Sequence, residues 1–190
     1  MKRGASEKYV LSDEQIHSIL AEAQSEEEKL ILELMVYLGL RASEIVHLRA
    51  TWLHGDELNI PRTQPCDCSS CREKGGVWSA KSDAAARSIA MPKAIQERLT
   101  QMLLQSPKGF SFTRQALWQK VKRWGKRAKI KMIYPHALRA TAATRLAERG
   151  MSAPALAYTL GWTNISMAWH YVNIAHAKAE AHQQMRRIME

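Results

Sequence analysis

The sequence lacks an uninterrupted apolar run long enough to cross a membrane. Its longest apolar stretch, residues 30–40, is broken by Glu33 and is much shorter than the roughly 20 residues that a membrane-spanning helix needs. The first ten residues carry basic side chains with no apolar segment behind them, unlike a signal peptide or an anchor. We therefore expect a cytoplasmic protein that has no membrane partner.

Cysteine is scarce and confined to one place. Only three of the 190 residues are cysteine, and all three lie within residues 66–71. An odd number of cysteines in so short a window does not form the disulfide framework of a small secreted protein. Reduced thiols and a bound metal ion are the two interpretations that remain.

Acidic residues are nearly absent from the second half of the chain. Residues 1–97 hold 12 Lys and Arg against 15 Asp and Glu, whereas residues 98–190 hold 16 against 3. Residues 108–131 contain nine basic residues and no acidic one. This pattern is typical of proteins that displace counterions from a phosphate backbone, although a solvated helix face has the same composition. The candidate DNA contacts are Arg114, Lys120, Lys122, Arg123, Lys126 and Arg127.

Most of the sequence has helical periodicity, and its length suits a single domain. Ser12 followed by Gln15 is typical of a capping box and predicts a helix to about residue 23. Gly39 marks a break, and Trp124 belongs to an apolar stripe that we expect in the core. Further helices are predicted over residues 25–39, 41–48, 92–105, 113–128, 135–150, 153–161 and from 165 onward, with short strands at 57–61, 77–80 and 87–91. These elements predict a mainly α fold with a small antiparallel β-sheet, of the α+β class.

Three separate segments hold polar residues that a plain core helix would not need. They are residues 39–44 (GLRASE), residues 135–139 (PHALR), and residues 160–162 (LGW) followed nine positions later by Tyr171. His136 and Arg139 are three positions apart, so they share one helix face and could address one phosphate. Each segment alone is also compatible with an ordinary structural role.

In this order and spacing the segments resemble the catalytic domain of the tyrosine recombinase family, the phage-integrase-type site-specific DNA recombinases. The resemblance covers residues 11–179. The matching boxes are residues 39–45 (GLRASEI), 136–144 (HALRATAAT), 160–166 (LGWTNIS) and 170–172 (HYV). The resemblance implies an enzyme that cleaves and rejoins double-stranded DNA through a covalent 3′-phosphotyrosyl intermediate. It also implies that no metal, ATP or small-molecule substrate takes part, that the protein acts as a dimer or tetramer on DNA, and that a prokaryote, virus or plasmid encodes it.

The resemblance assigns the phosphate contacts and the nucleophile. Arg41 and Arg139 would hold the non-bridging oxygens of the scissile phosphate, and Tyr171 would attack it. Glu44 lies three positions after Arg41 and could orient its guanidinium; the alternative is an ordinary surface ion pair. Two guanidiniums can neutralise a phosphoryl-transfer transition state without a metal ion.

The resemblance also assigns the proton-handling residues. His136 would serve as general base or as a phosphate donor. Lys81, between the second and third predicted strands, would protonate the leaving 5′ oxygen. Trp162 stands where most members of the family carry His; it can donate one hydrogen bond or buttress the site, but it cannot transfer protons.

Two features depart from the common family pattern, whereas the C-terminal tail has a counterpart in similar proteins. We expect residues 1–190 to be a single catalytic domain without the usual N-terminal helical domain, either as a fragment or as a minimal single-domain member. Residues 172–190 form an amphipathic tail, which either docks on a neighbouring protomer or folds back on its own core.

The second departure is the cysteine-bearing insertion, residues 62–76, which resembles insertions in archaeal members. Cys66, Cys68 and Cys71 offer three thiolates to a structural zinc ion, with His54 or Asp67 as a fourth ligand; free thiols are the alternative.

Two other functions compete with recombination. A type IB topoisomerase-like relaxing activity uses the same residue set. A non-catalytic DNA-binding protein could retain the fold alone, but the intact set of site residues argues against it.

Overall fold

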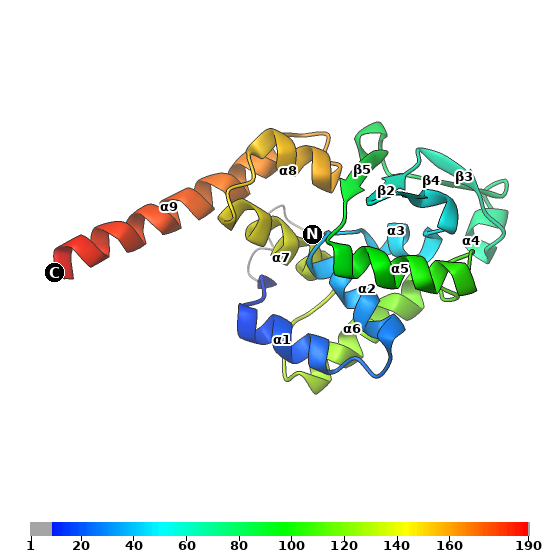
Figure 1. Cartoon of the computed structure of the whole chain (residues 1–190), viewed down its shortest axis with the longest axis horizontal. Coiled ribbons are helices and arrows are strands. Elements are labelled where there is room, and N and C mark those ends of the chain that lie inside the picture. Colours follow the sequence, from blue (N-terminus) through cyan, green and yellow to red (C-terminus); the bar gives the residue numbers. More distant parts are fainter. Residues whose placement is uncertain (1–8, 190) are drawn as a thin grey trace.

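The structure is a computed structural model that describes residues 9–189 (Figure 1). Most of the N-terminal segment discussed above, residues 1–8, therefore lies outside the described residues. The helices are α1 (Asp13–Ala21), α2 (Glu26–Val36), α3 (Ala42–His47), α4 (Ser69–Arg72), α5 (Lys93–Gln105), α6 (Arg114–Arg127), α7 (Pro135–Glu148), α8 (Ala153–Leu160) and α9 (Ser166–Met189). The strands are β1 (Leu53–His54), β2 (Glu57–Ile60), β3 (Thr63–Pro65), β4 (Val77–Ser79) and β5 (Arg87–Ala90).

The helix boundaries follow local sequence signals. The Ser12 hydroxyl accepts from the Gln15 amide at 3.3 Å, and the Gln15 side chain accepts from the Ser12 amide at 3.0 Å, so the predicted capping box is confirmed. Gly39 follows α2 with φ of +63°. A Cβ built there would lie 2.5 Å from Cδ2 of Leu160, so the chain turns where only glycine fits.

The strands form two small antiparallel sheets, which refines the prediction of one. β2 lies between β1 and β5 in a three-stranded sheet, and β3 pairs with β4 as a separate hairpin. β3 and α4 belong to the segment predicted as an insertion, residues 62–76, so the third cysteine lies on a helical turn inside that hairpin. The strand predicted at 77–80 therefore pairs within the insertion and not with the main sheet.

The core is built around α2, which the other elements enclose (Figure 1). All residues from Leu30 to Val36 are buried, including Glu33, because α5 and α7 pack against this helix from different sides. Trp124 is 1% exposed, which confirms its predicted place in the core. A second apolar cluster joins α7, α8 and the first turns of α9.

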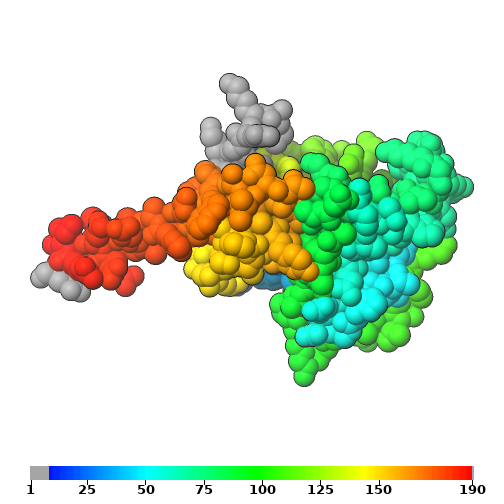
Figure 2. Space-filling model, turned by 90° about the horizontal axis from the view of Figure 1, so that it is seen from above, coloured from blue at the N-terminus to red at the C-terminus, as the bar shows by residue number. Residues whose placement is uncertain are grey.

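Helix α9 leaves the body of the molecule (Figures 1 and 2). Its first turns bury Ala168, Val172 and Ala175 against α7 and α8, whereas every described residue after Ala175 is exposed. The start of the tail therefore packs on its own chain, whereas residues 176–189 lie outside the core, with Lys178 paired to Glu148 of α7 at 2.6 Å and the apolar residues Met185 and Ile188 exposed. None of the helices in residues 9–189 has the length and apolar character to span a bilayer.

Candidate active site

The fold brings two of the three sequence segments, residues 39–44 and 135–139, to one pocket of about 790 Å³, which neither residues 160–162 nor Tyr171 line. The start of α3, the turn after β4, and the starts of α6 and α7 form its walls. Its basic lining residues are Arg41, Lys81, Arg114, His136 and Arg139. Such a pocket presents a concentrated positive charge to an anionic group.

Arg41 is held by two different acceptors. It occupies the N-cap position of α3, where its Nη1 donates to Glu44 Oε1 at 2.8 Å and its Nη2 donates to the carbonyl oxygen of Gly161 at 2.6 Å. The Glu44 carboxylate also accepts from the Arg41 amide at 2.8 Å. The predicted contact between the two side chains is present, and it fixes the guanidinium at the pocket wall.

Glu44 is a buried hub for a further arginine. Arg87, on β5, donates from Nη1 and Nη2 to the two carboxylate oxygens at 2.9 and 3.1 Å, and its side chain is fully buried. Burial alone would raise the pKa of Glu44, but the charge and hydrogen bonds of Arg87, followed by the charges of Arg139 and Arg41, lower it to about 2. The carboxylate therefore stays ionised throughout the physiological range.

Arg87 was missed by the sequence analysis. Its signal was available: Arg87 and Ile89 face the same side of a strand that alternates between buried and less buried positions. A charged residue on the inward face of a strand needs a buried partner of opposite sign. Arg87 also donates from Nε to the carbonyl of Thr159 at 2.7 Å, so it connects the sheet to the end of α8.

Arg139 joins the first and third boxes. Its guanidinium is buried and donates to the carbonyl oxygens of Gly39 and Leu160. Burial, followed by the charge of Arg41, lowers the pKa of Arg139 to about 9, while Glu44 opposes this shift. Arg139 thus remains charged at neutral pH.

His136 and Lys81 face the same pocket from opposite elements. His136 lies in the first turn of α7, and Lys81 follows β4 by two positions. Burial, followed by the charges of Arg139, Lys81 and Arg41, lowers the pKa of His136. His136 is therefore neutral at pH 7 and can accept a proton.

Trp162 contacts both Arg139 and Tyr171. Its ring lies 5.8 Å from the guanidinium carbon of Arg139 and stacks on the ring of Tyr171, with 5.5 Å between the ring centroids. Tyr171 is only 8% exposed, and its negative charge when ionised raises the pKa of Arg139. The predicted nucleophile thus lies near Arg139 and stacks on an indole ring that also contacts Arg139.

Comparison with known proteins decides the family. The model of the phage integrase family matches residues 9–178. The chain belongs to the phage integrase family.

Its relatives in this family include the tyrosine recombinase XerD of Staphylococcus aureus (strain Mu50), 27% identical over 154 residues. The match covers 80% of this chain but 51% of XerD, so the chain spans about half the length of the curated relatives it matches. XerD of Staphylococcus epidermidis is 33% identical over 88 residues, which cover 46% of this chain and 30% of that protein.

Solved structures of phage integrase family proteins have the same fold. The XerA recombinase superposes with a TM-score of 0.70 and 19% identity over 91% of this chain and 64% of XerA. The catalytic domain of bacteriophage HP1 integrase gives a TM-score of 0.64 and 18% identity over 92% of both chains. The Tn1549 transposon integrase in complex with circular intermediate DNA gives a TM-score of 0.66 and 22% identity, over 90% of this chain and 66% of that integrase. The predicted mainly α fold of a tyrosine recombinase catalytic domain is confirmed.

The basic residues of α6 divide into two groups in this integrase-family chain. Arg114 lines the pocket, and Lys122 lies over the ring of Trp118 at 5.2 Å. Arg123 and Lys126 are exposed. These four side chains are available to an external anion.

The remaining two predicted DNA contacts point elsewhere. Lys120 donates to Glu28 at 3.1 Å, and Arg127 pairs with Glu22 at 3.2 Å. Both therefore tie α6 to the acidic segment around α2. The charge pattern could not separate them from their neighbours because the acidic partners are far away in the sequence.

The cysteines have a different neighbour from those considered in the sequence. Cys66, Cys68 and Cys71 cluster with His47, and the four ligand atoms lie within 4.8 Å of one another. His54 is exposed and its ring contacts the carbonyl of Thr51, whereas Asp67 pairs with Lys108 at 2.7 Å. His47 could not be predicted as a ligand from the sequence, because it precedes the cysteines by 19 or more residues and lies on another element.

Proposed function

We propose that this chain is the catalytic domain of a site-specific DNA recombinase or integrase. One observation carries the proposal: Arg41 and Arg139 are held at one pocket, and Tyr171 lies near Arg139 and stacks on Trp162. A pair of fixed guanidiniums suits the equatorial oxygens of a phosphodiester, and a nearby phenol suits in-line attack. The substrate is double-stranded DNA.

In the proposed reaction the Tyr171 oxygen attacks the phosphorus and the bond from phosphorus to the 5′ oxygen breaks. The Tyr171 proton passes to His136, and Lys81 gives a proton to the leaving 5′ oxygen. Arg41 and Arg139 neutralise the charge on the non-bridging oxygens. The 3′-phosphotyrosyl link keeps the bond energy, so a 5′ hydroxyl of another strand rejoins the DNA by the reverse steps without ATP.

The proposed chemistry needs no cofactor, since the arginines supply the charge and the side chains supply the proton transfers. The cysteine cluster lies outside the catalytic pocket. We propose that a zinc ion held there is structural.

Assembly follows from the exposed tail. Residues 176–189 of α9 are exposed, although Lys178 pairs with Glu148 of the same chain, and their apolar side chains would be buried against a second copy. We propose a dimer or tetramer on DNA, formed in the cytoplasm on the DNA of a mobile element. DNA relaxation and binding without chemistry are less favoured, because the relatives are named recombinases and integrases and the full residue set is present.

The proposal is tested with a nicked duplex that loses a short 3′ product after cleavage, so that rejoining cannot occur. With free Mg²⁺ removed by EDTA, we expect a protein–DNA adduct that survives denaturant. Failure to form this adduct on any duplex, including the chain's own genomic flanks, while DNA still binds would favour the non-catalytic alternative. Relaxation of plasmids without a specific site would favour the topoisomerase-like one.

The pH dependence of cleavage separates the two roles of His136. Because the pKa of His136 is lowered, a general base at this position keeps its neutral form to a lower pH than usual, and single-turnover cleavage should decline only below the ordinary histidine pKa of about 6.5. His136→Asn should lower the rate by about 10²–10⁴ and remove this acid limb. A rate that rises as the pH falls would instead indicate a protonated His136 that donates to the phosphate.

Arg114 and Arg127 form a matched pair of charge deletions on α6. Arg114→Gln should weaken DNA binding. It should also make the fall of the logarithm of the binding constant with the logarithm of the salt concentration less steep by about 1, since one phosphate contact is lost. Arg127→Gln should leave both nearly unchanged, because this side chain already pairs with Glu22. Salt titrations of DNA binding by fluorescence anisotropy measure the difference. Equal slopes for the two variants would contradict this placement of the DNA.

A further inference from the structure

The His47 and cysteine cluster has the spacing of a metal site. His47 Nε2 lies 3.6 Å from Cys68 Sγ and 3.4 Å from Cys71 Sγ, and Cys66 Sγ completes the group within 4.8 Å. Bonds of about 2.0–2.1 Å to nitrogen and about 2.3 Å to sulfur in a tetrahedral zinc site separate the two ligands by about 3.5 Å. The side chains therefore already stand where a Cys₃His zinc site requires them.

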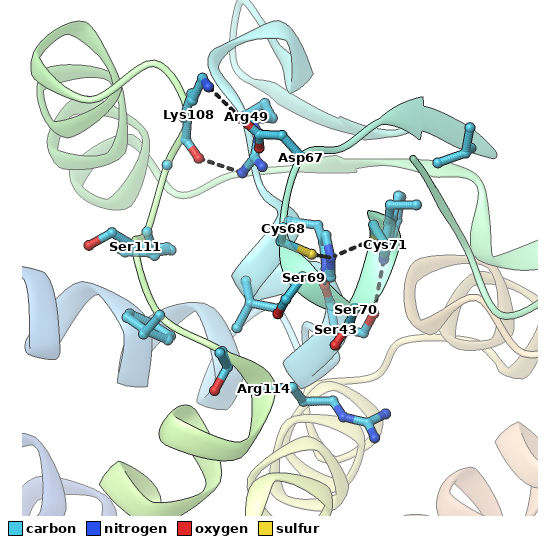
Figure 3. A pocket seen from close by; sticks show the side chains of 18 of the residues that line it. Ser43, Arg49, Asp67, Cys68, Ser69, Ser70, Cys71, Lys108, Ser111 and Arg114 are labelled. Atoms are coloured by element: carbon cyan, nitrogen blue, oxygen red, sulfur yellow. Dashed lines mark hydrogen bonds and ion pairs between the residues drawn. The ribbon is translucent and has the colours of Figure 1, made fainter. Parts of the chain in front are cut away.

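The surroundings of these ligands also suit a metal ion. His47 Nδ1 lies 2.7 Å from the carbonyl oxygen of Ser43, which accepts its proton and leaves the lone pair of Nε2 for the cluster. Zinc with three thiolates carries one net negative charge, and Arg49 Nη2 lies 3.9 Å from Cys66 Sγ. Figure 3 shows Cys68 and Cys71 on one wall of a pocket, opposite the loop that carries Ser111.

The cluster connects the insertion to the helix that follows Arg41. His47 is the last residue of α3, and the cysteines belong to the β3–β4 hairpin. The hairpin reaches α3 through Trp78, which stacks on His47 at 5.4 Å and donates to the Ser43 hydroxyl at 3.0 Å. Ser43 and Trp78 line both this pocket and the catalytic pocket.

We propose that His47, Cys66, Cys68 and Cys71 bind Zn²⁺, and that the ion fixes the hairpin against α3 and so positions Lys81. Lys81 follows the last residue of β4 by two positions, so a movement of the β3–β4 hairpin relative to α3 displaces Lys81 in the pocket. The second part of the proposal rests on the proposed recombinase function; the first part does not.

Metal binding is tested on the full chain. We expect one zinc per chain after purification under reducing conditions, and Co²⁺ in its place should give the strong visible absorption of a tetrahedral thiolate site. His47→Gln should lower zinc affinity by about tenfold or more, whereas His54→Gln keeps wild-type affinity. Zinc content is measured again after the EDTA step of the cleavage assay. Wild-type protein that binds no stoichiometric zinc when zinc is offered, or equal losses in both variants, would overturn the site.

The positioning role is tested with two leaving groups. A sulfur in place of the bridging 5′ oxygen leaves as a thiolate and needs no proton from Lys81. With His47→Gln we expect cleavage of the ordinary duplex to fall by about a hundredfold and cleavage of the sulfur-bridged duplex to change only a few-fold. Equal losses on both duplexes, or no loss, would overturn the positioning role. If wild-type protein cleaves neither duplex, the positioning role falls with the recombinase function, while the zinc measurement still decides the site.

Discussion

Replacing Tyr171 with phenylalanine should abolish the covalent DNA adduct while leaving DNA binding within about twofold of wild type. The substitution removes only the hydroxyl that attacks the phosphorus, and a phenyl ring keeps the stacking on Trp162. In the proposed mechanism no other group is expected to replace an oxygen nucleophile placed near Arg139. Denaturing gels of the nicked duplex measure the adduct, and anisotropy measures binding.

The matched control is Tyr158→Phe. Tyr158 is exposed on α8 and its hydroxyl accepts from the Ser88 amide at 3.3 Å, away from the pocket. This variant should form the adduct at nearly the wild-type rate. An adduct that persists in Tyr171→Phe would show that another residue is the nucleophile, and peptide mapping of the adduct would identify it.

Glu44→Gln should destabilise the fold strongly and lower the free energy of unfolding by about 3–5 kcal/mol. The amide cannot neutralise Arg87, whose side chain is fully buried and has no route to water. It also leaves Arg41 and Arg139 without their shared anion. Urea unfolding followed by far-UV circular dichroism measures this loss, and cleavage should be impaired in the fraction that still folds.

Glu33→Gln is the control for burial. Glu33 is also buried, but its partner Arg98 is 29% exposed and can turn to solvent. Glu33→Gln should therefore lower the free energy of unfolding by only about 1 kcal/mol. Adding Arg87→Met to Glu44→Gln should recover part of the stability, since the unpaired charge is removed. If Glu44→Gln costs no more than Glu33→Gln, the buried network does not stabilise this fold.

Glu44 also gives stability a dependence on pH. Its pKa is lowered from 4.5 to about 2 in the folded protein, so the unfolded chain takes up the proton first as the pH falls. The stabilisation is complete above pH 4.5 and is lost as the pH falls toward 2. The Glu44→Gln variant should lose less stability over this range, which urea unfolding at several pH values can measure.

The sequence predicted those parts of the site whose residues lie close together in the chain. Arg41 with Glu44, and His136 with Arg139, are three positions apart, and helical geometry alone places each pair on one face. The helices were equally predictable because capping residues and apolar periodicity mark them within a few residues. These features do not depend on how the chain packs.

The parts that escaped prediction are those made by tertiary packing. His47 and Arg87 reach their partners from elements more than ten residues away, and nothing near them in the sequence shows those partners. Lys120 and Arg127 were counted with the DNA contacts because their acidic partners lie in the first half of the chain. Charge that is summed along a sequence cannot reveal which side chains are already paired.

The continuity of α9 has a mechanical consequence. Tyr171 lies in the second turn of a helix that runs without interruption to Met189, a span of about 27 Å at 1.5 Å per residue. The buried turn near Val172 acts as a fulcrum, so a tilt of about 10° moves the far tip by about 5 Å but the nucleophile by well under 1 Å. In-line attack is sensitive to displacements on the order of 1 Å. In the proposed reaction the tail would thus act as a lever that converts a coarse movement at its tip into a fine adjustment of Tyr171, and a subunit that binds the tip would set the alignment of the attack.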